Sequence, residues 1–340
     1  MATSIDVIVP TRGRPEALHR LLQSLATDGG ETALRVLIGV DGPDAGERAI
    51  AEACGGGARL EVYDAPQSRG PAAVRNRLLE RVDADLVLML NDDVVADAGL
   101  IEAHVAAHAG LDRPAMVLGD APFAPVLDTR FGDASVFDRL IAERSMIFFY
   151  DRMRDRATGE PARPAEHDWG FRHAWTLNLS MPTAEARRIG GFEEALSGAA
   201  FEDLEFAYRA GLPVLFRPGA RVVHDHRYTP AGYRRRERAL GGHAWKLAEG
   251  NAECARAGCG RDIRSGDEID AVRAAVEGLA DEAESLAEWF DGLGERGGAG
   301  VSDRELDEIW ARHRVRMRGC WGRGLLEASE SCEPGTAASR

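Results

Sequence analysis

Two adjacent acidic residues, Asp92 and Asp93, follow the apolar run LVLML at 86–90. Adjacent carboxylates repel each other unless a cation lies between them. Carboxylate oxygens suit Mg²⁺ and Mn²⁺, and Mg²⁺ in particular usually completes its coordination with water and substrate phosphates. The pair therefore indicates half of a site for a divalent cation and a phosphorylated substrate. In the alternative interpretation, the two residues cap a helix that begins near Asp97 or form a solvated turn.

Other polar stretches are expected to lie close to this pair because they also follow predicted strands. The first 120 residues alternate between strand and helix patterns, which is typical of a parallel sheet covered by helices. Such sheets bind ligands outside the carboxyl ends of their strands. The predicted strands span 5–10, 34–40, 60–63 and 86–90, and the polar stretches that follow three of them are PTRGR at 10–14, DGPD at 41–44 and NDD at 91–93.

The rest of the chain changes character twice. Residues 135–156 favour a helix, and the stretch from 173 to 227 reads as a strand, two helices and two further strands. Beyond it, apolar residues at alternating spacings of three and four predict one amphipathic helix over 269–290. This seam either packs within the molecule, for example on a second helix around 303–318, or forms a homodimer interface.

Composition excludes several classes of protein. The chain has 340 residues, 44% of them hydrophobic, which is enough for a full core in one or two domains. No apolar run approaches the roughly 20 residues of a membrane span and no signal peptide is evident, so we expect a cytoplasmic protein without a transmembrane segment. A formal charge of −14 disfavours a nucleic-acid partner. Five cysteines without a CxxC pair favour idle thiols over a zinc site.

Five motifs occur in order over roughly residues 4–230: VIVPTRGRPEAL, SRGPAAVRNRLLE, LNDDVV, IGGFEE and FEDLEFAYRAG. In the same order, they resemble motifs of the inverting family 2 glycosyltransferases of the GT-A fold. These are similar to the family's opening strand and turn, its N-x-G-x-x-x-A-R-N helix, its DxD-type motif, its G-G-F-D/E turn and its E-D motif. The chain departs from the pattern at Arg12, where an aromatic residue is common, at VDGP, which carries one Asp, and at Asn91, which replaces the first acid.

The resemblance implies an α/β GT-A fold: a Rossmann-like mixed sheet flanked by helices, with a helical C-terminal appendage. We expect a catalytic domain over residues 1–240, a helical region over 241–326 and a disordered tail over 327–340. Within the catalytic domain, residues 1–120 would bind the nucleotide sugar and 121–240 would bind the acceptor and carry the base.

The implied substrates are a nucleotide-diphosphate sugar as donor and a hydroxyl group as acceptor. The donor-binding residues carried over from the motifs are Pro10, Thr11, Arg12, Arg14, Asp41, Arg75 and Asp92. Two of them have simpler alternatives: Asp41 as a turn residue before Gly42 and Pro43, and Arg75 as a partner in a surface salt bridge.

The same resemblance implies a catalytic base and a metal site. Asp203 matches the base of the E-D motif, and Glu202 and Asn178 are expected to contact the acceptor or support the site. Glu202 and Asp203 point about 100° apart on a helix, so only one should face the substrate. Asp93 and His224 would hold Mn²⁺ or Mg²⁺, which stabilises charge on the leaving diphosphate. Alternatively, Asp203 is a charge that the helix dipole favours, and His224 is structural.

Two other classes of function stay open at this point. A nucleotidyltransferase also holds a metal with acids on such a sheet, but usually has a glycine-rich loop with a basic residue directly after its first strand. A non-catalytic binding protein on a degenerate GT-A domain is the second alternative, and the presence of Asp93, Asp203 and His224 argues against it.

Overall fold

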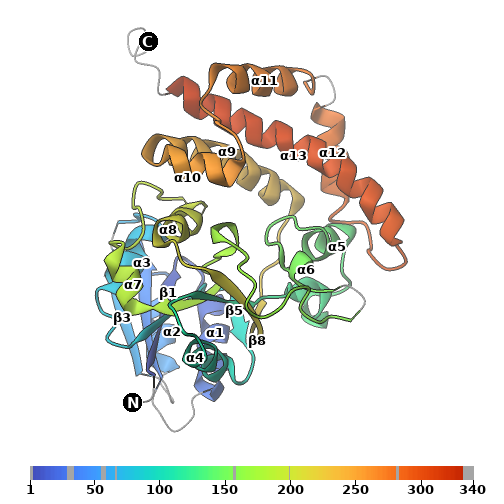
Figure 1. The fold of residues 1–340 in the computed structure, drawn as a ribbon. Helices are drawn as coiled ribbons and strands as arrows, with labels where there is room; N and C mark the ends of the chain where they lie inside the picture. The colour runs from blue at the N-terminus through green and yellow to red at the C-terminus, as the bar shows by residue number, and fades with distance from the viewer. Residues whose placement is uncertain are drawn as a thin grey trace. The chain divides into compact units, whose positions relative to one another are not determined.

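The computed structural model describes residues 3–28, 34–54, 59–65, 67–155, 158–198, 200–280 and 283–331. The chain forms two compact units (Figure 1). The first comprises Met1–Leu127 and Ser145–His226, and the second Asp128–Arg144 and Arg227–Arg340. Residues 128–144 and 227–240, which we assigned to the catalytic domain, thus belong to the second unit.

The first unit is built on an eight-stranded mixed sheet with the strand order β3-β2-β1-β4-β7-β6-β8-β5. Strands β3, β2, β1 and β4 run parallel, whereas β7 is antiparallel to both of its neighbours. The strands are β1 Ile5–Thr11, β2 Arg35–Asp41, β3 Arg59–Ala65, β4 Leu86–Leu90, β5 Val94–Ala96, β6 Met116–Asp120, β7 Asn178–Pro182 and β8 Val214–His224. This confirms the predicted mixed α/β sheet.

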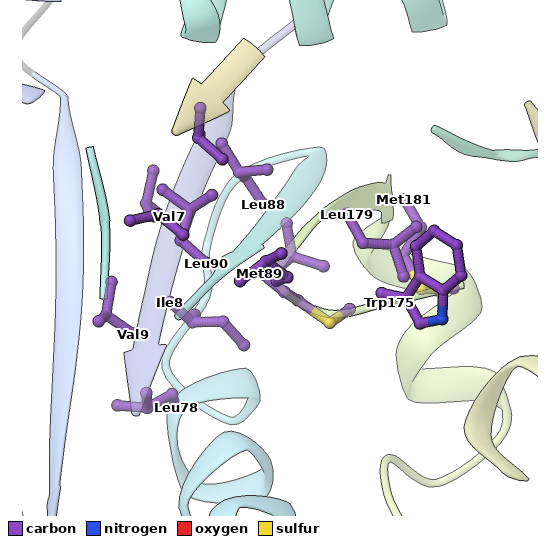
Figure 2. Close-up of a cluster of buried hydrophobic side chains, with 14 of the residues drawn as sticks. Val7, Ile8, Val9, Leu78, Leu88, Met89, Leu90, Trp175, Leu179 and Met181 are labelled. Atoms are coloured by element: carbon purple, nitrogen blue, oxygen red, sulfur yellow. The ribbon is translucent and has the colours of Figure 1, made fainter. Parts of the chain in front are cut away.

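Helices flank the sheet, and the central strands are buried on both faces. Every residue of β4 is buried, and Figure 2 shows Leu88, Met89 and Leu90 of this strand among the labelled core side chains. The helices of this unit are α1 Pro15–Asp28, α2 Glu47–Ala53, α3 Pro71–Leu79, α4 Leu100–Ala109, α6 Tyr150–Met153, α7 Thr183–Arg188 and α8 Glu202–Ala210, with short 3₁₀ turns at Ala124–Val126 and Phe171–His173. Pro15 and Pro71 open α1 and α3, as predicted from their fixed φ.

The strand order reverses beside β1, and this brings the polar strand ends together. β1 pairs with β2 on one side and with β4 on the other, both in parallel. The residues after β1 and β4 therefore leave the sheet at the same edge, which is where open α/β sheets bind ligands. Residues 10–14 and 91–93 meet there.

The second unit is helical. Its helices are α5 Val136–Glu143, α9 Pro230–Gly250, α10 Ala252–Cys259, α11 Gly266–Glu277, α12 Ala283–Gly292 and α13 Asp303–Ser331, with a 3₁₀ turn at Thr129–Phe131. Helices α9 and α13 lie side by side (Figure 1) and approach closely at glycines: a Cβ at Gly241 would overlap the Trp321 carbonyl oxygen. We expected a disordered tail over 327–340. Residues 327–331 instead continue α13, and residues 332–340 lie outside the described residues.

We predicted one helix over the amphipathic segment at 269–290. This prediction is wrong, because the segment divides into α11 and α12. The apolar face of α11 lies on α13, where Val276 and Leu279 would meet side chains added at Gly322 and Gly319. Packing on a neighbouring helix, one of the two alternatives, is therefore confirmed for this part of the seam. No helix of the described residues combines the length and apolarity needed to cross a membrane.

Replacement of both Val276 and Leu279 by Glu should destabilise the second unit, because the new carboxylates would have to be desolvated against α13. We expect each change to lower the free energy of unfolding by roughly 1–3 kcal/mol, measured by urea denaturation. Val315→Glu is the control, since Val315 is 48% exposed on α13 and should tolerate the charge. A double variant as stable as the Val315 control would contradict this packing.

Candidate functional site

The two carboxylates after β4 are buried and held by groups at the end of β1 and just after it. Thr11 Oγ1 donates to Asp92 Oδ2 at 2.7 Å. The guanidinium of Arg14 contacts both acids: Nη2 lies 2.5 Å from Asp92 Oδ1, and Nη1 lies 2.5 Å from Asp93 Oδ2. The cation that the sequence required between the carboxylates is, in this structure, an arginine of the same chain.

The two acids have opposite protonation tendencies. Burial raises the pKa of Asp92, the charge of Arg14 opposes this shift, and the charge of Asp93 adds to it. Burial also disfavours ionisation of Asp93, but the nearby side chains of His224 and Arg14 outweigh burial and lower the pKa of Asp93. Asp93 is therefore the carboxylate that stays ionised.

His224 reaches the acids through strand pairing. β5 and β8 pair antiparallel with Val94 opposite His224, and the Asp225 amide donates to the Asp93 carbonyl at 2.8 Å. This register places His224 Nε2 3.7 Å from Asp93 Oδ2. His226 stacks on His224 with ring centroids 6.0 Å apart. The predicted proximity of Asp93 and His224 is thus present in the structure.

The side chains of Asp93 and His224 together fit a divalent ion that brings further ligands with it. Asp93 Oδ1 is buried and accepts no hydrogen bond from the described residues. Within the same described ranges, no three His, Cys, Asp or Glu side chains gather into a complete metal cage. One carboxylate and one imidazole supply oxygen and nitrogen, and water and phosphate oxygens would complete the shell.

Asp41, at the end of β2, holds the loop that leads into α3. Its carboxylate accepts hydrogen bonds from Ser68 Oγ at 2.9 Å and from the amides of Arg69 and Gly70 at 2.8 and 3.2 Å. It is 5% exposed. The carboxylate thus holds residues 68–70, a role that the sequence did not predict, and a contact with a nucleoside stays a prediction. The same is true of Pro10, half-buried in β1, and Arg12, exposed in the turn after it.

Arg75 lies inside the protein, and its head group faces protein side chains. Its Nη1 donates to Glu202 Oε1 at 3.0 Å, and its Nη2 donates to Asn91 Oδ1 at 3.2 Å. The guanidinium also lies over the Phe192 ring, 5.5 Å from its centroid. The structure therefore shows a buried ion pair, where we expected either a donor contact or a surface salt bridge. Arg75 connects the strand end that carries the acid pair to helix α8.

Helix α8 presents its first two acids, Glu202 and Asp203, in different environments. Glu202 is buried against Arg75, and burial and the charge of Asp203 raise its pKa to about 7, although Arg75 opposes the shift. Asp203 is half-buried, and its Oδ1 accepts from the Leu204 amide at 2.8 Å. Burial raises the pKa of Asp203 too, and the charge of Arg75 opposes that shift. Glu202 faces inward, which leaves Asp203 as the acid with access to solvent.

Asn178 belongs to a buried network at the start of β7. It donates to the carbonyls of Asp120 and Ala220 at 3.1 and 2.9 Å, and its Oδ1 lies 2.9 Å from His104 Nε2. His104 also contacts Ser180. Because Asn178 is completely buried and lies opposite Leu90 of β4, a supporting role suits it better than an acceptor contact and stays a prediction. The sequence motifs did not point to His104, whose only signal is a polar residue in the apolar helix LIEAHVAAHA.

Comparison with known proteins identifies the family of this chain. The sequence matches the profile of glycosyl transferase family 2 over residues 6–175, half of the chain, and the chain belongs to this family. The pre-mycofactocin glycosyltransferase of Mycobacterium tuberculosis is 26% identical to it over 251 residues, which cover 72% of this chain and 47% of that protein. The validoxylamine A glucosyltransferase of Streptomyces hygroscopicus subsp. jinggangensis is 26% identical over 223 residues, or 62% of this chain and 52% of that protein.

A solved structure extends the comparison to the fold. The mannosyltransferase from Pyrobaculum calidifontis, in complex with GDP-Man and Mn²⁺, superimposes with a TM-score of 0.56 at 15% identity, covering 98% of this chain and 89% of that one. The predicted GT-A fold is thereby confirmed. The chain spans about half the length of the two relatives named above.

Removal of the Arg75 side chain should be costly, because Glu202 would remain buried without its partner. We expect Arg75→Met to lower the free energy of unfolding by about 3–5 kcal/mol, measured by urea denaturation. The double variant Arg75→Met, Glu202→Gln should lose less than the sum of its single changes.

The matched control is Arg69→Met. Arg69 also pairs with a glutamate, Glu194, but the two side chains are 65% and 37% exposed. Its loss should cost about 0–1 kcal/mol. Equal losses at positions 69 and 75 would show that burial of the Arg75 pair has no energetic weight.

Proposed function

We propose that the chain is a metal-dependent inverting glycosyltransferase that moves a sugar from a nucleotide-diphosphate donor to a hydroxyl acceptor. One observation carries the proposal: Arg75 contacts Asn91, beside the acid pair, and Glu202, beside Asp203. The same buried side chain thus contacts the neighbour of the candidate metal ligand Asp93 and the neighbour of the candidate base Asp203. Membership of family 2 supports the same reaction class and disfavours a nucleotidyltransferase.

The donor would bind at the edge where β1 and β4 end. Asp93 and His224 would hold Mn²⁺ or Mg²⁺, and the bound ion supplies Lewis-acid stabilisation of the leaving diphosphate. Arg14, which carries a full positive charge at this edge, would contact the phosphates, and Asp92 would contact the ribose or the sugar. Pro10, Thr11, Arg12 and Asp41 would line the nucleoside side.

The acceptor would be activated from α8. Asp203 takes the proton from the acceptor hydroxyl while the hydroxyl oxygen forms a bond to the anomeric carbon and the bond from that carbon to the diphosphate breaks. A single displacement inverts the anomeric configuration. Asp203 is suited to this role because its raised pKa makes it a stronger base than an exposed aspartate while it remains accessible to solvent.

The names of the relatives support a hexose donor. A glucosyltransferase stands among the sequence relatives, and the structural neighbour was solved with GDP-Man and Mn²⁺. We therefore propose a nucleotide-activated hexose as the donor for this chain. The cytoplasmic location expected from the sequence is a separate proposal. Because α11 packs on α13 inside the second unit, a homodimer through the 269–290 segment has less support than the other proposals.

Loss of Asp93 should abolish the metal-dependent part of donor binding. In wild type, UDP or GDP with Mn²⁺ should raise the melting temperature above that with nucleotide alone. Asp93→Ala should remove this increment, and His224→Ala should reduce it less because water can replace an imidazole ligand. Asp97→Ala, an exposed acid in the same segment, should behave as wild type. An unchanged increment in Asp93→Ala would refute the metal assignment.

Loss of the base should separate binding from turnover. Asp203→Asn keeps the size of the side chain but cannot accept the proton, so Mn²⁺ and nucleotide should still bind while transfer falls roughly 10²–10⁴-fold. Glu202→Gln should cost much less, because it faces Arg75. Release of nucleoside diphosphate from UDP-glucose and GDP-mannose measures turnover, and NMR gives the anomeric configuration. Equal losses of transfer in Asp203→Asn and Glu202→Gln would show that Asp203 is not the base. A product with retained anomeric configuration would refute the inverting mechanism.

A further inference from the structure

The Arg14 guanidinium contacts the Asp93 oxygen that faces His224, the second candidate metal ligand. Its Nη1 lies 2.5 Å from Asp93 Oδ2, the same oxygen that lies 3.7 Å from His224 Nε2. Two more contacts, from Nη2 and Nε, bind it to Asp92. The oxygen that faces the second candidate ligand is therefore already engaged by a cation of the chain itself.

Arg14 is the part of this cluster that can leave. Its side chain is 43% exposed, whereas those of Asp92 and Asp93 are 0% and 8% exposed. The backbone of Arg14 is held on both sides, since its amide donates to Glu47 Oε1 at 3.3 Å and its carbonyl accepts from the Leu18 amide at 3.1 Å. The carboxylates are held by β4 and Thr11. Rotation of the Arg14 side chain alone would expose the acid pair.

Charge determines when this rotation is favourable. Without a cation, two adjacent buried carboxylates could not both stay ionised. A divalent ion and a guanidinium beside the same carboxylate would repel each other, so binding of the ion favours displacement of Arg14. A nucleoside diphosphate arriving at this edge offers negative charges to which the displaced guanidinium can bind.

We propose that Arg14 is an exchangeable counter-cation: it neutralises Asp92 and Asp93 in the free protein and moves to the diphosphate when donor and divalent ion bind. The inference rests on the metal-dependent function proposed above. It makes the ion bind weakly to the free protein, and it makes nucleotide and ion strengthen each other's binding, which is reciprocal by linkage.

The experiment measures the affinity for Mn²⁺ alone, by electron paramagnetic resonance of the free ion. Arg14→Gln should bind Mn²⁺ more tightly than wild type, by a factor within the roughly 5–150-fold range of typical coupling. Arg14→Lys, which keeps a charge without the bidentate fork, should lie between the two. Arg113→Gln is the control and should match wild type, because it removes one charge from an exposed side chain that belongs to no part of the proposed site.

A second titration repeats the measurement with saturating UDP or GDP. Wild type should gain Mn²⁺ affinity, and Arg14→Gln should gain markedly less. Equal nucleotide-free affinities of wild type, Arg14→Gln and Arg14→Lys, with native circular dichroism, would overturn the exchange, even if wild type binds Mn²⁺ with nucleotide. Absence of Mn²⁺ binding to wild type with either nucleotide would instead refute the metal-dependent function itself, and the exchange with it.

Discussion

Two buried carboxylates at the end of β4 need a positive charge beside them, and much of the first unit is arranged around that need. Thr11 ends β1, Arg14 comes from the turn after it, and His224 comes from the end of β8. They meet because β1 is the parallel neighbour of β4 and because β5, which follows the acids directly, pairs with β8. Had the acids stood in mid-strand, no part of the loops could have reached them.

A second constraint is that the acid pair after β4 and the proposed base on α8 come from separate parts of the sheet and of the chain. The acids lie on the parallel half of the sheet, while α8 follows the antiparallel strand β7 far along the chain. Arg75 joins them through Asn91 and Glu202. Because an interior ion pair is costly to break on one side only, this connection resists small displacements of α8. Such rigidity suits catalysis, in which misplacement of a base by an ångström is expensive.

Much of this arrangement can be anticipated from the sequence, and the failures have physical causes. Apolar runs such as LVLML and proline-led helices follow from local patterns, and the meeting of residues 10–14 with 91–93 follows from parallel pairing. The environment of Arg75 could not be anticipated, because whether an arginine is buried depends on partners more than a hundred residues away. The break between α11 and α12 could not be predicted, because the apolar spacing of three and four continues across it.

The second unit is made from two separate stretches of chain, and this affects how the protein can be divided. Phe137 of α5 packs edge-on against Tyr233 of α9 and Phe290 of α12, with ring centroids 5.9 and 5.4 Å apart. A chain cut after residue 226 would keep α5 but lose the helices that cover its aromatic face. That exposed face would invite aggregation. Exchange of C-terminal regions between relatives would therefore succeed only if the stretch at 128–144 were exchanged with them.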